Sequence, residues 1–461
     1  MASLAAVPAR FPPDRLALVH GDARWTFGDL DARSADWART LVARGVVADD
    51  LVAFSLPNGP AFIALAFGIY RAGATPAPIS GKLPTIEREA ILAVMRPRLY
   101  LTANDKPDDH APPVAAAPVA ASWKACTSGG STGTPKVIVD GREAAFPDGT
   151  DFIGIPADTV VLVPGPLYHN APFSAVIFAL WKGNTVVTMD RFDAAGSLAL
   201  IERERVAWSI MVPTMLHRIW MLPAPVRDGY DLSSWRMVVH TAAPMAPWLK
   251  LAWIDWRGPD HIWEVYGATE GLVRCWIGGA EWLDRPGSVG RPIGGARLRI
   301  LDERGDEVAT GETGEVFAMP PGGPATSYRY LGASRRAVAG GWESVGDCGR
   351  VDADGYLFLA DRRTDLIIQG GVNIWPAEVE AAILRHPDVA SCAVYGEDDA
   401  DLGQRVHAVV EATAPLMLES LRSFLAEHLV RDKWPRALTV QSAPVRDDAG
   451  KFRKIRPKAT A

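Results

Sequence analysis

The sequence predicts an α/β protein with a large N-terminal domain of αβ layers, in which the sheets are mostly parallel, and a small α+β domain at the C-terminal end. Through most of the chain, short apolar strands alternate with helical patterns, which is typical of βαβ units. From Gly346 onward, charged residues crowd a short span, and compact strands and helices follow. Because 461 residues are too many for one core, we place a boundary in the charged span 361–365, which gives domains 1–363 and 364–461.

The first elements have clear start and stop signals. Thr26 can cap a helix, Asp29 lies in its first turn, and Gly45 ends it. The next segment predicts two buried strands on either side of a second helix, which Gly73 ends. These elements are expected at 51–55, 58–72 and 75–78.

The middle of the chain continues the alternation after an exposed, Pro/Ala-rich connector at 105–122. Strands are expected at 160–163, 208–212, 237–240, 262–266 and 273–277, with a helix at 175–181. Strands at 298–301 and 314–319 indicate a small antiparallel subdomain. In the C-terminal domain we expect strands at 366–369, 389–395 and 406–411 and helices at 376–384 and 416–429.

Composition limits the possible partners and location. A net charge of −6 argues against nucleic acid or an anionic membrane as the main partner. The N-terminus does not resemble a signal peptide, and no apolar run is long enough to span a membrane, so we expect a cytoplasmic protein. The four cysteines lack metal-ligand spacing, and Cys126 is interpreted as a buried apolar residue rather than a nucleophile.

One polar loop stands out between residues 125 and 138. It contains eight consecutive small residues, followed by Pro135, Lys136 and an apolar run: Thr127, Ser128, Gly129, Gly130, Ser131, Thr132, Gly133 and Thr134. Glycines allow backbone N–H groups to approach an anion closely, hydroxyls add donors, and lysine adds a charge for phosphate. The pattern therefore favours a phosphate-binding loop.

Three other interpretations compete with a phosphate-binding loop. A Walker A loop requires lysine directly after the last glycine, but Thr134 and Pro135 separate Gly133 from Lys136. Residues 129–133 match the Gly-x-Ser-x-Gly elbow of hydrolases, with Ser131 as nucleophile. A flexible Gly/Ser linker is the third, although a linker does not need Pro-Lys before β-branched residues.

Motifs elsewhere in the chain, in the same order, resemble those of the adenylate-forming superfamily, which includes acyl-CoA ligases, luciferases and peptide-synthetase adenylation domains. The matching segments are Trp-Thr-Phe-Gly-Asp-Leu (25–30), Tyr-Arg-Ala-Gly-Ala (70–74), the loop at 127–136, Pro-Leu-Tyr-His-Asn (166–170), Tyr-Gly-Ala-Thr-Glu (266–270), Gly-Ser-Val-Gly-Arg-Pro (287–292), Gly-Asp (346–347) with Arg362, and Gly-Lys (450–451). Each match alone is weak. Together they cover nearly the whole chain.

The resemblance implies an ATP site that also holds Mg²⁺. Glu270 would hold the cation, Thr269 the α-phosphate and Asp347 the ribose hydroxyls. The remaining ATP contacts implied are the loop residues Thr127 to Gly133, Lys136, Ala242, Ala243, Tyr266, Gly267 and Arg362. For Glu270, Asp347 and Arg362 taken singly, a solvated or surface ion-pair role is the alternative, and for Tyr266 an ordinary buried aromatic.

The resemblance also implies that the C-terminal domain is mobile and contributes two faces. Lys451 would reach the active site and neutralise charge on the carboxylate and α-phosphate, and a basic tail in solvent is the alternative. Thr364 stands at the hinge position, where the family usually has Asp or Lys. Gly370 and Gly371 would line the path of the CoA thiol. The domain would rotate between the two half-reactions.

The acid itself would lie near His169. The acyl pocket implied by the resemblance contains His169, Val212, Met215, His240 and Trp263. The spellings at 165–173, 281–287 and 360–365 resemble bile-acid-type CoA ligases and actinobacterial relatives, whose acids are steroid- or terpenoid-like, such as diterpenoid acids of the platensimycin type.

Three functions follow from these patterns. The first is an ATP- and Mg²⁺-dependent ligase that joins a bulky carboxylic acid to CoA through an acyl adenylate. The second keeps the adenylation but passes the acyl group to a carrier protein or partner enzyme. The third is a serine hydrolase that uses Ser131 with His386, His407 or His428. The sequence leaves the exact acid and the oligomeric state open, with a homodimer among the alternatives.

Overall fold

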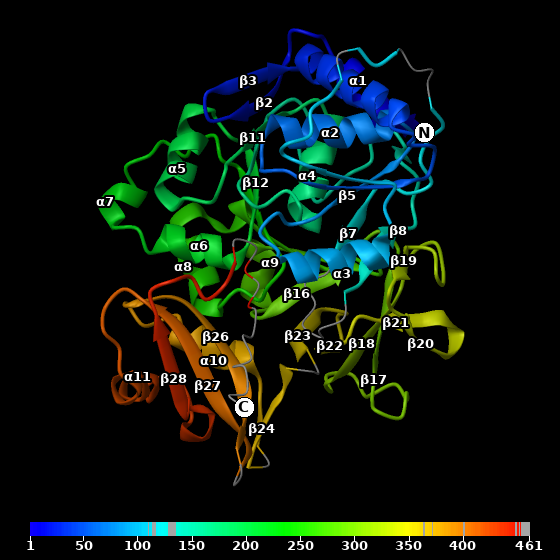
Figure 1. Ribbon diagram of the computed structural model, residues 1–461. Helices are drawn as coiled ribbons and strands as arrows, with labels where there is room; N and C mark the ends of the chain where they lie inside the picture. The colour runs from blue at the N-terminus through cyan, green and yellow to red at the C-terminus, as the bar shows by residue number, and fades with distance from the viewer. Residues whose placement is uncertain are drawn as a thin grey trace.

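A computed structural model describes residues 1–108, 110–112, 117–127, 135–362, 365–370, 372–399, 402–447, 450 and 452. Figure 1 shows a large region of layered helices and sheets, with a smaller orange and red unit below it. The expected α/β class with a large and a small domain is confirmed. No helix in the described ranges is both long and apolar enough to cross a membrane.

The main sheet contains 15 strands in the described residues and has a parallel centre. The centre is formed by β2 (Leu16–His20), β11 (Thr185–Thr188), β10 (Val160–Val163), β12 (Trp208–Met211), β13 (Met237–His240) and β14 (Ile262–Gly267). Antiparallel strands extend the sheet on both sides: β3 (Ala23–Thr26), β15 (Arg274–Gly278), β16 (Ser288–Pro292), β17 (Arg297–Leu301), β18 (Gly314–Met319), β20 (Arg336–Val338), β21 (Trp342–Ser344), β22 (Asp347–Val351) and β23 (Leu357–Arg362).

Alternate residues of the central strands supply two separate cores. On β13, Val239 joins the core under one set of helices, and Val238 joins the core under another. The first set is α1 (Phe27–Ala43), α2 (Pro60–Arg71) and α4 (Asn170–Trp181). The second set is α5 (Ala194–Arg203), α6 (Pro213–Trp220) and α8 (Pro247–Arg257). Further helices are α3 (Thr85–Met95), α7 (Ala224–Arg227) and α9 (Gly279–Asp284).

Two small sheets complete the large region. One is parallel: β4 (Leu51–Ser55), β5 (Thr75–Pro78) and β6 (Leu99–Thr102). The other is antiparallel: β7 (Ala125–Thr127), β8 (Val137–Asp140) and β19 (Tyr328–Leu331). Thr127 pairs with Val137, so the loop between them joins two hydrogen-bonded strands. A short pair, β1 (Ala2–Ser3) and β9 (Ala145–Phe146), lies apart.

The C-terminal region has a sheet and a core of its own. Its elements are β24 (Ile367–Gln369), β25 (Val372–Ile374), α10 (Pro376–Ile383), β26 (Val389–Asp399), β27 (Gly403–Ala412), α11 (Leu418–Leu425) and β28 (Ala437–Gln441). The buried cluster that fills this unit draws only on residues between Ile367 and Leu425, with partly buried neighbours up to Leu438. We call this unit the small domain.

Most element predictions are confirmed, with several corrections, among them β26, which runs to Asp399 rather than 395. Thr26 and Asp29 form the expected reciprocal cap of α1. However, α4 begins at Asn170, five residues before the predicted start, because Pro172 is tolerated in a first turn. Helix α11 ends at Leu425 rather than 429. The connector predicted to be exposed is buried at its end, where Ala120 and Ser122 are covered.

Candidate active site

Several of the site candidates among the described residues lie where the parallel strands end. His240 closes β13, Gly267 closes β14, and Pro213 opens α6 directly after the loop that follows β12. In α/β sheets, ligands bind outside the carboxyl ends of the strands. Thr269 and Glu270 lie in the turn that follows β14 at this edge, and the N–H of Gly271 donates to the carbonyl of Ala268 across that turn.

A buried carboxylate links this turn to the end of the polar loop. Glu270 is 5% exposed, and its Oε1 accepts from the Tyr330 hydroxyl at 2.5 Å. Lys136 Nζ lies 3.2 Å from the same oxygen and 3.3 Å from the Tyr330 hydroxyl. Burial and the adjacent Glu270 raise the pKa of Tyr330, so its hydroxyl remains a donor. The predicted residues 128–134 lie outside the described residues, but both ends of their loop are placed.

The geometry around Glu270 fits a Mg²⁺ site of one protein ligand. Within the described residues, Oε1 accepts both hydrogen bonds and Oε2 accepts none. No cluster of three or more His, Cys, Asp or Glu suited to a metal occurs in the described part of the chain. Mg²⁺ binds one or two carboxylates together with phosphate oxygens and water, so it suits such a position when a nucleotide is present.

Tyr266 and Asp347 come together from two strands of the main sheet that are not neighbours, β14 and β22. The Tyr266 hydroxyl donates to Asp347 Oδ2 at 2.7 Å. Asp347 opens β22 and lies opposite Arg362 on β23. The three residues predicted to surround the nucleoside therefore converge, although the side chain of Arg362 lies outside the described part.

Ala242, one of the residues expected to contact ATP, has an unusual backbone conformation. Its φ is 74°, in the left-handed region that a non-glycine residue rarely occupies. Such strain costs about 1–3 kcal/mol and is typical of ligand-binding loops. Ala242 and Ala243 follow the end of β13 after Thr241, at the same edge as Gly267.

The predicted acyl residues occupy two different faces of the sheet. His240 is fully buried, and its Nε2 lies 3.5 Å from Glu264 Oε2, which also accepts from Lys250 Nζ at 2.5 Å. Burial and the nearby Lys250 lower the pKa of His240, which favours a neutral ring. Trp263 is on the opposite face, stacked on Trp276 with ring centroids 5.0 Å apart. The structure therefore does not bring His240 and Trp263 together on one pocket wall.

His169 is the N-cap residue of α4, and its ring centroid lies 4.4 Å from that of Tyr168. Lys124, which was not predicted as a site residue, contacts the residue after His169 and is 5% exposed. Lys124 Nζ donates to Asn170 Oδ1 and lies 3.1 Å from Ser174 Oγ. Lys124 thus ties the strand before the polar loop to the first turn of α4. The sequence feature that could have indicated Lys124 is a lysine within an apolar stretch.

The small domain contacts the large region beside this site. Trp248 Nε1 donates to the carbonyl of Ala381 at 3.1 Å, and His217 Nε2 lies 3.3 Å from that of Leu384. A Cβ on Gly450 would lie 3.7 Å from Val212 Cβ. The red C-terminal segment in Figure 1 accordingly runs up to α6. Lys451, Gly371 and Thr364 lie outside the described residues, whereas Gly370 is placed, with its N–H donating to the carbonyl of Leu402.

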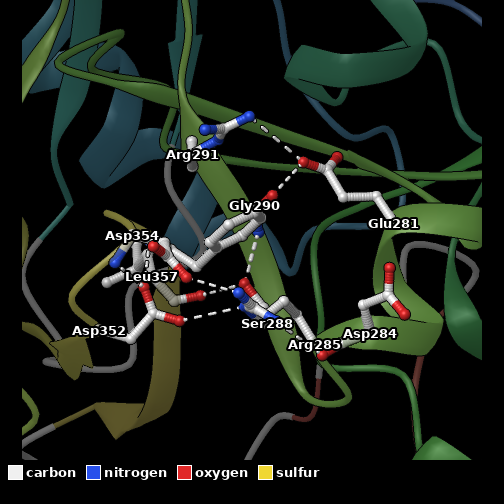
Figure 2. Close-up of polar contacts among 10 residues, drawn as sticks. Glu281, Asp284, Arg285, Ser288, Gly290, Arg291, Asp352, Asp354 and Leu357 are labelled. Atoms are coloured by element: carbon white, nitrogen blue, oxygen red, sulfur yellow. Dashed lines mark hydrogen bonds and ion pairs between the residues drawn. The ribbon is translucent and has the colours of Figure 1, made fainter.

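A polar junction secures the strands that carry Asp347 and Arg362. Figure 2 shows Ser288 Oγ donating to the carbonyl of Leu357 at 2.9 Å, while Gly290 N–H donates to Ser288 Oγ. Arg285 Nη2 contacts Asp354 Oδ2 at 2.5 Å, and Arg291 Nη2 lies 3.5 Å from Glu281 Oε1. The Gly-Ser-Val-Gly-Arg-Pro motif thereby fixes β16 against β23.

Replacing Gly290 by alanine is expected to lower stability by roughly 3 kcal/mol or more. A Cβ there would lie 2.1 Å from the Trp276 carbonyl oxygen, and the φ of Gly290 is 91°. Gly287→Ala is the matched control, since its φ is 87° but nothing lies within 4 Å, so about 1 kcal/mol is expected. Urea denaturation followed by tryptophan fluorescence measures both; equal losses would contradict a steric role.

The described residues contain no arrangement of His386, His407 or His428 that would form a catalytic triad for a hydrolase. His386 and His428 both pack against Phe424, and His407 contacts Glu397 and Thr439, all within the small domain. All four cysteines are free and buried, as predicted for Cys126. Burial raises the pKa of Cys275 to about 12, which makes it a poor nucleophile.

Comparisons with known proteins show the family and the fold of this chain. The family model for AMP-binding enzymes matches residues 4–126 and 122–329, and the model for the C-terminal domain of AMP-binding enzymes matches residues 378–451. A 2-succinylbenzoate–CoA ligase from Bacillus licheniformis is 30% identical over 93% of each chain. A fatty acid–acyl-carrier-protein ligase from Streptomyces coeruleorubidus is 28% identical over 96% of this chain and 93% of that protein. The solved o-succinylbenzoate CoA synthetase of Bacillus subtilis, in complex with its acyl-adenylate intermediate, has a TM-score of 0.82 at 25% identity and covers 98% of this chain and 97% of that one.

Proposed function

Since this chain belongs to the AMP-binding enzyme family, we propose that it is an AMP-forming acid–thiol ligase. It activates a carboxylic acid with ATP to an acyl adenylate, releases pyrophosphate, and transfers the acyl group to CoA. The observation that carries this function is a set of contacts that involve predicted ATP-site residues. Lys136 and Tyr330 contact Glu270, and Tyr266 contacts Asp347. Both family models match the chain that contains these residues.

The first step joins two anions, so the residues mainly align and neutralise charge. A carboxylate oxygen attacks the α-phosphorus, and the bond to the pyrophosphate oxygen breaks. We assign Lys136 and the loop residues to the departing phosphates, Thr269 to the α-phosphate, and Asp347 with Arg362 to the ribose. Glu270 would hold Mg²⁺, which would supply positive charge at the phosphates. Tyr330 and Lys136 hold the Glu270 carboxylate in place by their contacts with its Oε1.

In the second step, the thiol sulfur of CoA attacks the acyl carbonyl, the proton of the thiol is lost, and AMP leaves. We propose that domain 364–461 turns about Thr364 relative to domain 1–363 and brings Gly370 and Gly371 to the site. Support comes from the separate core of the small domain and from its contacts through single hydrogen bonds such as Trp248 to Ala381.

The acceptor can also be a carrier protein, and the ligase from Streptomyces coeruleorubidus described above favours this second candidate. Incubation with acid and ATP, with CoA or with a carrier protein in its phosphopantetheine form, separates the two. A CoA thioester supports the first candidate. A product only on the carrier protein would support the second.

We further propose that the acid is bulky. The support is the amino-acid sequence of the segments 165–173 and 281–287, which resembles the corresponding segments of ligases for steroid- and terpenoid-like acids. The relative from Bacillus licheniformis is named for an aromatic acid instead, so a panel for ATP–pyrophosphate exchange should contain aromatic, fatty and polycyclic acids. Acid-dependent exchange supports the proposed function, and no exchange with any class would contradict it.

Changing Glu270 to Gln is expected to weaken the dependence of exchange on Mg²⁺. The amide still accepts from Tyr330 but loses the charge that attracts the cation, so the Mg²⁺ concentration for half-maximal exchange should rise about 10- to 100-fold. The exposed Glu89→Gln on α3 is the matched control. An unchanged Mg²⁺ titration would show that Glu270 does not hold the cation.

A cytoplasmic location is also proposed, supported by the four free thiols, which are typical of a reducing compartment.

A further inference from the structure

Arg274 lies at the ligand-binding edge of the main sheet. Strands β14 and β15 are antiparallel, and Arg274 pairs with Gly267, the last residue of β14. The first residue of β15 therefore lies beside the carboxyl end of β14, four positions after Glu270. A Cβ on Gly267 would lie 3.4 Å from Arg274 Cγ, so the arginine side chain runs alongside the Tyr-Gly-Ala-Thr-Glu segment.

The guanidinium of Arg274 has no partner in the described residues. It is partly buried, yet no hydrogen bond, ion pair or ring contact joins it to another described side chain or carbonyl. Arg257 is also partly buried, but it donates to the carbonyls of Leu232 and Trp235. A partly buried cation without a partner is costly in the free protein, which points to a partner that arrives from outside.

The nearby carboxylates are already occupied. Asp140 is bound by Arg142, with two contacts of 2.9 Å. Asp151 lies 2.8 Å from Lys182 Nζ. Asp140 and Asp151 favour the charged form of Arg274 only at longer range, while Arg142 opposes it, and burial lowers the pKa of Arg274. The surroundings of Arg274 thus keep a positive charge available for an acceptor.

The same face of the sheet offers an aromatic wall. Residues alternate along β15, so Arg274 and Trp276 share a face, and Trp276 stacks on Trp263 of β14 at an interplanar angle of 21°. Arg274 thus lies on the same face as a flat indole pair, two residues along β15 from Trp276. This combination suits a ligand with an apolar body and one polar oxygen on it.

We propose that Arg274 is a specificity-determining residue that binds a second acceptor oxygen, a carboxylate or carbonyl on the body of the acid, away from the carboxylate that is activated. This assignment rests on the proposed ligase function. A guanidinium matches such planar acceptors with paired N–H groups. The activated carboxylate has other candidate partners in His169 and Lys451, and Arg274 is on a different element from His169.

The test compares three acids of one scaffold in ATP–pyrophosphate exchange: 4-phenylbutanoate, 4-oxo-4-phenylbutanoate and 2-succinylbenzoate, which carry no, one and two additional acceptor groups. A second pair is a fused-ring acid with and without a keto group. The wild-type protein should favour acceptor-bearing acids in kcat/KM by about 10- to 100-fold. In Arg274→Met the preference for acceptor-bearing acids should shrink to about threefold or less. Arg274→Lys should keep part of this preference. The control variant Arg236→Met, at an exposed arginine, should keep the full preference.

Two further readouts separate this role from others. If Arg274 only supported the fold, Arg274→Met would lower the thermal midpoint; the proposal expects an unchanged or higher midpoint and unchanged AMP binding by titration calorimetry. An equal loss of kcat/KM for all acids in Arg274→Met would mean that Arg274 binds the activated carboxylate, and it would overturn the proposal. An unchanged preference for acceptor-bearing acids in Arg274→Met would also overturn it. No exchange by the wild type with any acid would instead contradict the proposed function, and the assignment of Arg274 with it.

Discussion

Replacing Lys451 by alanine should lower acid-dependent ATP–pyrophosphate exchange by about 10²–10³-fold, the usual loss for one group that stabilises transition-state charge. Lys451 directly follows Gly450, which lies against Val212 and Thr214 where α6 begins. This places the start of the Gly-Lys motif at the edge of the main sheet where the ATP residues meet. In the mechanism proposed above, Lys451 reaches the two anions while the small domain lies against the start of α6.

The same variant should form thioester from a supplied acyl adenylate and CoA at nearly the wild-type rate, because we propose that the second step uses another face of the small domain. Lys433→Ala is the matched control, since this lysine contacts Glu378 at 2.6 Å within the small domain. Loss of both half-reactions in Lys451→Ala, or of neither, would contradict the role assigned to Lys451.

Replacing Gly371 by tryptophan should produce the opposite pattern. An indole at this position would block the expected path of the CoA arm, and we expect thioester formation to fall by about 10²-fold or more while exchange stays within about threefold, since steric misplacement can cost 10²-fold. Stopped-flow mixing of adenylate with CoA measures the first quantity.

The matched control for this variant is Gly81→Trp. Gly81 is exposed, has no left-handed φ, and a Cβ there would lie 3.9 Å from its nearest neighbour, Ser55 Cβ. If Gly371→Trp reduced exchange as strongly as thioester formation, the assignment of separate faces to the two steps would be wrong.

Short apolar segments between glycine or proline signals were predicted with exact bounds. Strands β4, β5, β10, β13 and β18 begin and end where the sequence indicates. The start of α4 was placed too late because its first turn, Asn-Ala-Pro, contains a proline and overlaps a motif that resembles a binding loop. The local pattern of apolar residues therefore predicted the positions of these strands well. At α4, the residues of the Pro-Leu-Tyr-His-Asn motif hid the start of the helix.

Long-range contacts explain what the sequence could not show about the site. Tyr330 reaches Glu270 from 60 positions away, and Lys124 reaches Asn170 from 46 positions away, so no local spacing pairs them. The faces of β13 and β14 separate His240 from Trp263, although both were expected in one pocket. In contrast, Tyr266 and Asp347 could be expected to meet, since the collinear motifs placed both at the nucleoside.

The central claim, attack of a carboxylate on the α-phosphate of ATP, can be tested by following oxygen. An accepted acid is labelled with ¹⁸O in both carboxylate oxygens and incubated with ATP, Mg²⁺ and CoA, and the nucleotide product is measured by mass spectrometry. The mechanism predicts AMP with one ¹⁸O and a CoA thioester with the other, both dependent on the acid. Unlabelled AMP, or label in phosphate beside ADP, would contradict it.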